Sequence, residues 1–371
     1  MTSEKDPQYG RLEPMLASLE ALVRCESPTE DLDACRSVVQ LAGDIATRVL
    51  GIPAQIKEIE GRPVFWWGAE HPDVLVLAHL DTVWPRGSYQ PLWEVKGDVL
   101  RGPGTFDMKA GFVQALFALK GIAGSVALVA TTDEETGSHA SKALIKDLSS
   151  HAKAVLVLES SLDGKVKTGR KGTAMYKITV HGVASHAGLE PEKGVNTTTE
   201  IAHTILALAV LENAEHGTTV VPTLLHSGNT TNTVPDLAVL DIDVRSFSQA
   251  ELERVDAAIK KFVAVNPQAR LEITGGLNRP PLQPTSTKAL YERAEKVAAS
   301  IGMKPLGCAE VGGASDGNFA AAAGAQVLDG LGAVGGGAHA PSEWVKISSM
   351  QERSDFLHAL IKDLLEEELI S

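Results

Sequence analysis

Three short apolar segments constrain the fold of this chain more than any other feature. VLVLAH (74–79), VALVAT (126–131) and AVLVLE (154–159) are each six residues long and rich in valine and leucine. Continuous apolar runs of this length are typical of strands buried on both faces of a parallel sheet. Helical patterns at 112–121 and 140–149 lie between them, so strand and helix alternate. The alternation predicts an α/β domain.

A different pattern begins near residue 170. The segment 174–183 alternates apolar and polar residues, as a half-exposed strand does. Further elements are expected as a helix at 194–211, strands near 219–227 and 237–245, a helix at 249–264 and a strand near 270–275. This β-α-β-β-α-β order is the split βαβ motif of ferredoxin-like domains.

After three prolines between 280 and 284, the α/β pattern returns, with helices expected at 286–301 and 347–369 and a strand at 325–329. We therefore predict a mostly parallel α/β domain made of residues 1–169 and 280–371. A ferredoxin-like α+β domain, residues 170–279, would be inserted into it. A length of 371 residues agrees with two domains.

Charge and composition narrow the possible partners. The chain carries 34 Lys+Arg against 47 Asp+Glu, a net charge of −13, which argues against nucleic acid or an anionic membrane as partner. The sequence has no apolar run near the roughly 18 residues that a membrane span requires. Its first residues lack the basic and apolar regions of a signal peptide. Three cysteines form a sparse, odd set, which favours a reducing cytoplasm.

Polar residues follow each of the apolar runs, where an open α/β sheet binds its ligands. His79 and Asp81 follow the first run, and the period of two in a strand would put both side chains on one face. His79 would then be a metal ligand, and Asp81 the carboxylate that orients its ring. Glu134 and Glu135 follow the second run, and one can bind a metal while the other moves a proton. The third run ends at Glu159.

Two more candidate ligands lie outside these runs. Asp107 falls in a glycine-flanked loop, RGPGTFDMKAG, just before a predicted helix, and GGGAHAPSE supplies His339 far downstream. Two histidines and several carboxylates suit Zn²⁺, with Co²⁺ or Mn²⁺ as alternatives. Five ligands suffice for two ions if one carboxylate bridges them. A two-metal site of this kind clamps a carbonyl oxygen and activates a water.

Seven motifs in order along the chain resemble the co-catalytic zinc metallopeptidase family of glutamate carboxypeptidase, acetylornithine deacetylase and succinyl-diaminopimelate desuccinylase. They are HLDTV (79–83), GPGTFDMKAG (102–111), TTDEETGS (131–138), LES (158–160), VASHAG (183–188), GNTTNTVPD (228–236) and AHAPSE (338–343). The resemblance covers nearly the whole chain and is closest to carboxypeptidases of the G type.

The resemblance implies a role for each candidate ligand. His79, Asp107 and Glu159 would bind one zinc ion. Asp107, Glu135 and His339 would bind the other, so that Asp107 is the bridge. Glu134 would be the general base, and Asp81 would orient His79.

For the inserted domain, the resemblance implies a lid and a homodimer interface. His186 would help to stabilise the oxyanion in the partner subunit's active site, although a purely structural histidine is the alternative. Asn232 and Arg245 match positions that bind the substrate carboxylate, and Arg279 resembles another such arginine in a looser local match. Arg245 could instead pair with Asp241 or Asp243 on its own strand.

The function expected is therefore hydrolysis of an amide bond next to a free carboxylate, with Glu134 as general base on a metal-bridging water. The substrate would be a small peptide or an N-acyl amino acid. A deacylase of N-acyl amino acids or a dipeptidase could use the same residues. A more remote alternative is an inactive metal-binding or ligand-binding protein, against which the presence of Glu134 argues.

Overall fold

The computed structural model describes residues 11–366, and the chain forms two compact units. The first contains the chain up to Gly169, residues 283–311, and the chain from Ser315 onward; the second contains residues 170–282 and 312–314. The helices of the described chain include none that is long and apolar enough to cross a membrane.

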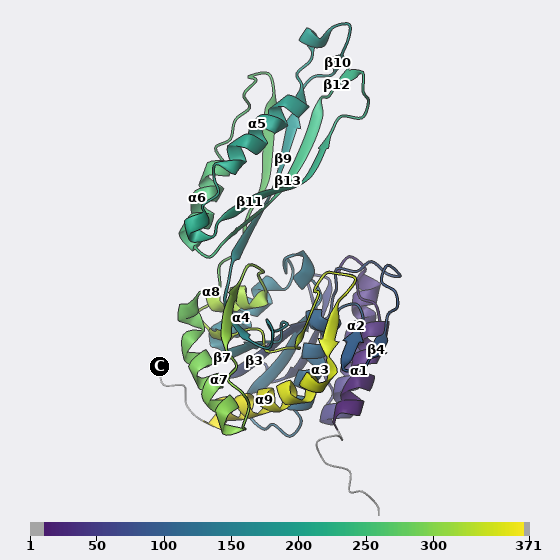
Figure 1. Cartoon of the computed structure of the whole chain (residues 1–371), viewed down its shortest axis with the longest axis vertical. Helices are drawn as coiled ribbons and strands as arrows, with labels where there is room; N and C mark the ends of the chain where they lie inside the picture. The colour runs from purple at the N-terminus through teal and green to yellow at the C-terminus, as the bar shows by residue number, and fades with distance from the viewer. Residues whose placement is uncertain (1–10, 367–371) are drawn as a thin grey trace, which may run out of the picture. The chain divides into compact units, whose positions relative to one another are not determined.

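A six-stranded sheet organises the first unit (Figure 1). Its strands, in spatial order, are β1 (Gln55–Ile59), β2 (Arg62–Gly68), β6 (Val126–Thr131), β3 (Val74–His79), β7 (Ala154–Val157) and β16 (Gln326–Leu328). The last four run parallel to one another, whereas β1 and β2 form an antiparallel edge. The predicted mostly parallel α/β fold is confirmed.

Both faces of the parallel strands are covered. Every residue of β3 and β6 is buried, as expected for continuous apolar runs. One core cluster joins Val74, Val76 and Ala78 to residues of α1 (Leu12–Arg24), α2 (Leu32–Leu50), α3 (Ala110–Ala118), α7 (Lys288–Ser300) and α9 (Ile347–Glu366). The alternate residues Leu75 and Leu77 are buried as well. Two further helices, α4 (Lys142–His151) and α8 (Asp316–Ala322), contact each other, and α8 contacts β7.

The third apolar run is shorter as a strand than the sequence predicted. β7 ends at Val157, which pairs with Leu77 of β3. The chain then turns away, and Ser161 N–H donates to the carbonyl of Ala333. Glu159 therefore lies in a loop beyond the strand rather than at its last position. The predicted helix at 347–369 agrees with α9 as far as Glu366, and its last residues lie outside the described chain.

Smaller sheets complete the first unit. A four-stranded sheet contains β17 (Gly335–Gly336), β18 (Trp344–Lys346), β5 (Val99–Arg101) and β4 (Glu94–Lys96), and β15 (Cys308–Val311) pairs with β8 (Val166–Arg170). Through β18 and β5, the loop that carries His339 is fixed beside the loop that carries Asp107.

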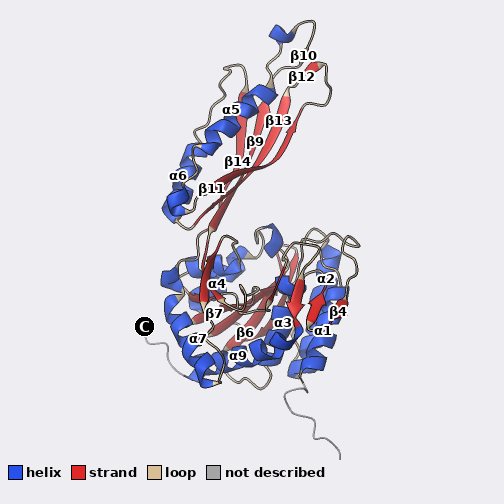
Figure 2. Ribbon diagram, in the orientation of Figure 1, coloured by secondary structure: helices blue, strands red, loops and turns tan. Residues whose placement is uncertain are grey.

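The second unit has an antiparallel sheet with its helices on one face (Figures 1 and 2). The strand order is β11 (Thr219–Ser227), β13 (Leu237–Ser246), β9 (Gly172–His181) and β14 (Arg270–Arg279), and the helices are α5 (Thr197–Ala209) and α6 (Gln249–Ile259). Residues of β13 alternate between buried and more exposed positions, so one face packs against α5 and α6. A short pair, β10 (Ser185–His186) with β12 (Thr233–Val234), extends the unit. The predicted ferredoxin-like element order is present.

Candidate metal centre

The carboxyl ends of the parallel strands bring the first candidate ligands together. His79 is the last residue of β3, and Thr131 beside it is the last residue of β6. Glu134 follows β6 by three residues, and Glu159 follows β7 by two. Ligand atoms of His79, Glu134 and Glu159 lie within 4.8 Å of one another, and all three residues are buried.

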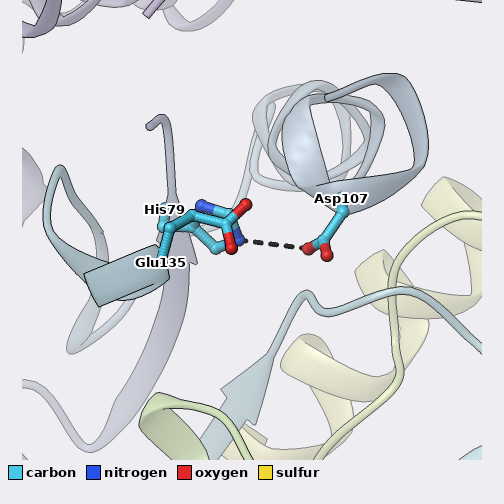
Figure 3. A group of neighbouring side chains, drawn as sticks. All are labelled: His79, Asp107 and Glu135. Atoms are coloured by element: carbon cyan, nitrogen blue, oxygen red, sulfur yellow. Dashed lines mark hydrogen bonds and ion pairs between the residues drawn. The ribbon is translucent and has the colours of Figure 1, made fainter. Parts of the chain in front are cut away.

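Asp107 comes from a loop of irregular backbone. Gly104 has a left-handed φ of 67°, and Asp107 itself has non-helical angles immediately before α3 begins. This bend directs the carboxylate of Asp107 toward His79 and Glu135 (Figure 3).

The carboxylate of Asp107 lies between the two histidines. Its Oδ1 is 3.2 Å from His79 Nε2, and its Oδ2 is 3.3 Å from His339 Nε2. On the outer sides, Glu159 Oε1 lies 3.8 Å from His79 Nε2, and Glu135 Oε2 lies 3.0 Å from His339 Nε2. These contacts connect the five residues, and Asp107 lies next to both histidines.

A tight turn places the adjacent residues Glu134 and Glu135 in different surroundings. Glu134 begins the short 3₁₀ helix Glu134–Thr136, which ends at Gly137 with a φ of 100°. The side chain of Asp133 accepts hydrogen bonds from the N–H groups of Ala140 and Ser141, at 2.8 and 3.2 Å, and so holds the turn closed. Glu134 groups with His79 and Glu159, whereas Glu135 groups with His79 and Asp107.

Asp81 connects two of the ligand-bearing segments. It is fully buried, and its Oδ2 accepts hydrogen bonds from Thr29 Oγ1 at 2.8 Å and from the N–H of Glu135 at 3.2 Å. Its Oδ1 lies 3.4 Å from His79 Nδ1, and its carbonyl oxygen lies 3.0 Å from the same nitrogen. Since a carbonyl can only accept, Nδ1 carries a proton, and the Nε2 lone pair of a neutral His79 would be available to a metal ion.

The pKa shifts of the cluster show that its carboxylates stabilise positive charge on the two histidines. Burial by itself would lower the pKa of His79, but hydrogen bonds to Asp107 and Asp81 raise that pKa well above its usual value. Hydrogen bonds to Asp107 and Glu135 raise the pKa of His339 to about 10. Burial opposes ionisation of Asp107, yet the two histidines hold its pKa far below the usual range. Burial raises the pKa of Glu135.

The donor set fits two divalent ions. Four carboxylates and two imidazoles converge, so two ions would balance the four negative charges. Ligand atoms around a tetrahedral zinc ion stand about 3.3 Å apart, given bonds of about 2.0 Å. The separations of 3.2 Å between His79 and Asp107, and of 3.3 and 3.0 Å from His339 to Asp107 and Glu135, are close to that value. Protonated imidazoles and metal ions both supply positive charge that offsets the carboxylates. Metal ions would displace the imidazole protons on binding.

Glu343 is a buried residue to which the sequence analysis assigned no role. It is 1% exposed. Its Oε1 accepts hydrogen bonds from the N–H groups of Phe106 and Asp107, at 2.8 and 3.0 Å, and its Oε2 accepts one from Gly104 at 3.0 Å. Burial raises the pKa of Glu343 to about 7, against the effect of these hydrogen bonds. The available signal was its place in the motif AHAPSE, four residues after His339.

The remaining predicted residues belong to the second unit. His186 is exposed, and its Nδ1 accepts hydrogen bonds from the N–H groups of Gly188 and Leu189, both at 3.1 Å. Nδ1 is therefore unprotonated, and the proton of the neutral ring sits on Nε2. Asn232 is exposed beside it, and its carbonyl accepts from the N–H of Ala187.

The two arginines differ in exposure. Arg245 forms a bidentate pair with Asp243, at 2.8 and 3.1 Å, and also donates to the carbonyl of Gly312 at 3.2 Å. Of the two pairings open to it on its strand, the structure has the one with Asp243. Arg279 is buried at the end of β14, opposite Thr173 of β9.

Residues 75–363 match the model of the peptidase family M20/M25/M40. The chain belongs to this family. It is an M20 metallo-hydrolase, and the family's enzymes depend on a dinuclear metal centre. The resemblance inferred from the seven motifs is thereby confirmed.

Two curated relatives and one solved structure are among the similar proteins. Carboxypeptidase G2 from Pseudomonas sp. (strain RS-16) is 32% identical over 310 residues, which cover 79% of this chain and 74% of the relative. Succinyl-diaminopimelate desuccinylase from Dechloromonas aromatica is 27% identical over 328 residues, covering 80% and 82%. The M20 metallo-carboxypeptidase Sso-CP2 from Sulfolobus solfataricus shares the fold, with a TM-score of 0.74, 18% identity and coverage of 95% and 99%.

Proposed function

We propose that this M20 hydrolase cleaves an amide bond next to a free carboxylate, as a glutamate-carboxypeptidase-like metallopeptidase. The observation that carries the proposal is the place of Asp107, whose two oxygens face His79 and His339 at 3.2 and 3.3 Å. This arrangement suits a carboxylate that bridges two metal ions. The similarity to carboxypeptidase G2 supports the choice of substrate class.

The proposed ligands are His79, Asp107 and Glu159 for one ion, and Asp107, Glu135 and His339 for the other. Zinc is the proposed metal because nitrogen and oxygen donors are mixed, with Co²⁺ or Mn²⁺ as alternatives. When bound, two such ions would polarise the scissile carbonyl and lower the pKa of a bound water molecule.

Glu134 is the proposed general base. Its carboxylate lies within 4.8 Å of ligand atoms of His79 and Glu159, yet the other group of ligands forms without it. It would accept a proton from the attacking water and donate it to the leaving nitrogen. Asp81 would keep the lone pair of His79 Nε2 directed at the centre by holding the proton on Nδ1.

Residues of the second unit would bind the substrate. The Nε2–H of His186 is suited to donate a hydrogen bond to the developing oxyanion. Asn232, Arg245 and Arg279 are proposed to bind the substrate carboxylate, for which a guanidinium can form two parallel hydrogen bonds. Arg245 would have to exchange its contact with Asp243 for the substrate.

We also propose that the protein is a homodimer through the second unit and acts in the cytoplasm. β11 is an edge strand with exposed Val221, Leu224 and Leu225, and α5 exposes Leu206. Edge strands with apolar side chains favour pairing with a second chain. The three cysteines are free thiols, as in a reducing compartment.

A deacylase of N-acyl amino acids is the second candidate, supported by the similarity to succinyl-diaminopimelate desuccinylase. A dipeptidase would use the same groups. Because all these reactions share one metal centre, the side chains that bind the substrate decide between them. An inactive binding protein is less compatible with a buried Glu134 beside the ligands.

The test compares wild type with Glu134→Gln on C-terminal glutamate peptides, N-acetyl and N-succinyl amino acids, and dipeptides. We expect the glutamate peptides to give the highest kcat/KM, and Glu134→Gln to lower kcat at least 10²-fold. Glu70→Gln, an exposed carboxylate paired with Lys57, is the matched control and should leave kcat unchanged. Removal of metal by a chelator should abolish activity, and Zn²⁺ should restore it. Equal rates for wild type and Glu134→Gln would refute the proposed role.

A further inference from the structure

The side chain of Glu343 joins two loops of the first unit that are far apart in the sequence. It accepts hydrogen bonds from the backbone N–H groups of Gly104, Phe106 and Asp107, at 3.0, 2.8 and 3.0 Å. The indole Nε1–H of Trp84 donates to the same carboxylate at 3.4 Å. Four donors therefore converge on two oxygens of a residue that is 1% exposed.

The backbone of Glu343 belongs to the other loop. Its N–H donates to the carbonyl of Ala340 at 2.9 Å, which closes the turn that follows His339. The next residue, Trp344, begins β18 and pairs with Arg101 of β5. Glu343 is thus anchored in a sheet on one side and bound to the Asp107 loop on the other.

We propose that Glu343 is a positioning residue that sets the geometry of the metal centre by holding the Asp107 loop against the His339 turn. Asp107 has non-helical backbone angles, and the loop donates three N–H groups to one carboxylate. These bonds fix where the backbone of Asp107 lies, and therefore how far its Oδ2 stands from His339 Nε2, which is 3.3 Å. The inference rests on the proposed two-metal centre.

The substitution Glu343→Gln tests this with little change in shape. An amide offers one acceptor oxygen where the carboxylate offers two, and its NH₂ group would face N–H donors. Either the pair Phe106 and Asp107 or the pair Gly104 and Trp84 loses its acceptor. The loop must then shift, and the ion shared by Asp107, Glu135 and His339 should bind more weakly.

The experiment titrates chelator-treated protein with Co²⁺, following heat by calorimetry and visible absorption. Wild type should bind two ions. Glu343→Gln should bind the His339-side ion at least tenfold more weakly, with the affected ion assigned by comparison with His339→Ala. Ser342→Ala, at the exposed neighbouring position in the same turn, should stay within twofold of wild type.

Stability must be separated from positioning. A folded Glu343→Gln variant that has a lower Tm but binds two Co²⁺ ions with wild-type affinity would overturn the proposal. If Glu343→Gln does not fold, Trp84→Phe decides, because it removes one donor to Oε2 and keeps a ring beside Tyr89. Co²⁺ affinity at least twofold weaker than in Ser342→Ala supports the proposal, and unchanged affinity overturns it. A wild type that binds fewer than two ions would refute the metal centre itself.

Discussion

Replacing Asp81 by asparagine tests how the buried carboxylate supports the metal centre. Two donors bind Oδ2, Thr29 Oγ1 at 2.8 Å and the N–H of Glu135 at 3.2 Å, and His79 Nδ1 lies 3.4 Å from Oδ1, which has no hydrogen-bond partner among the described residues. Asparagine has one acceptor oxygen and one NH₂ group. In either orientation of the amide, the NH₂ group of asparagine therefore faces one of these donors.

The size of the effect follows from the burial and charge of Asp81. Asp81 is fully buried, and a hydrogen bond to a charged group contributes about 1.5–3 kcal/mol. A donor facing His79, or the loss of one such bond, corresponds to roughly 10–100-fold in metal affinity or activity, the range typical for residues that orient metal ligands. We expect Asp81→Asn to weaken Zn²⁺ binding and lower kcat/KM by about that factor.

The assay measures Zn²⁺ affinity against a competing chelator, together with kcat/KM on the best substrate of the panel. Thr29→Val is the matched control, because it removes one donor and leaves the charge of Asp81 in place. Its effect should be smaller than that of Asp81→Asn, because the carboxylate keeps its charge and the hydrogen bond from the N–H of Glu135. The reasoning is refuted if Asp81→Asn folds normally and both quantities stay within twofold of wild type.

Two further predictions concern stability. Burial lowers the pKa of Lys109 to about 8, below about 10.4 in the unfolded chain, so between these values the unfolded chain binds more protons and stability rises with pH. The Tm difference between wild type and Lys109→Met should therefore shift in favour of wild type from pH 7.5 to 10; a constant difference would contradict this. In Gly111→Ala, the new Cβ would lie 2.3 Å from the carbonyl of Leu158, which should cost about 1–3 kcal/mol in urea unfolding. Gly43→Ala, with nothing within 4 Å, should instead stabilise helix α2, and equal effects at the two glycines would argue against the packing explanation.

The sequence predicted the fold class well because the buried strands are local patterns. The runs 74–79 and 126–131 are β3 and β6 with the same ends, since every residue in them is buried by helices on both faces. The third run was extended by two residues, because Leu158 is buried like a strand residue and its N–H still donates to the carbonyl of Leu77, although β7 ends at Val157. Strand β2, the segment RPVFWWG, was missed because it is antiparallel and its pairing with β6 depends on sequence 60 residues away.

Within the candidate site, motif spacing selected the residues, and distance in the folded chain decided their grouping. The sequence placed Glu134 and Glu135 side by side, and only the turn held by Asp133 separates their surroundings. The sequence allows Arg245 to pair with Asp241 or Asp243, and the fold brings it to Asp243.

The sequence by itself determined the alternation of strands and helices, the excess of acidic residues, and the set of histidines and carboxylates at the strand ends. Each of these features depends on composition or on residues that are close together in the sequence. The tertiary structure decided that Asp107 stands between His79 and His339, and that Glu343 holds the loop that puts it there. The contacts of Asp107 with His339 and Glu343 join segments more than 200 residues apart. Burial and hydrogen-bond geometry between such segments exist only once the core has brought them together.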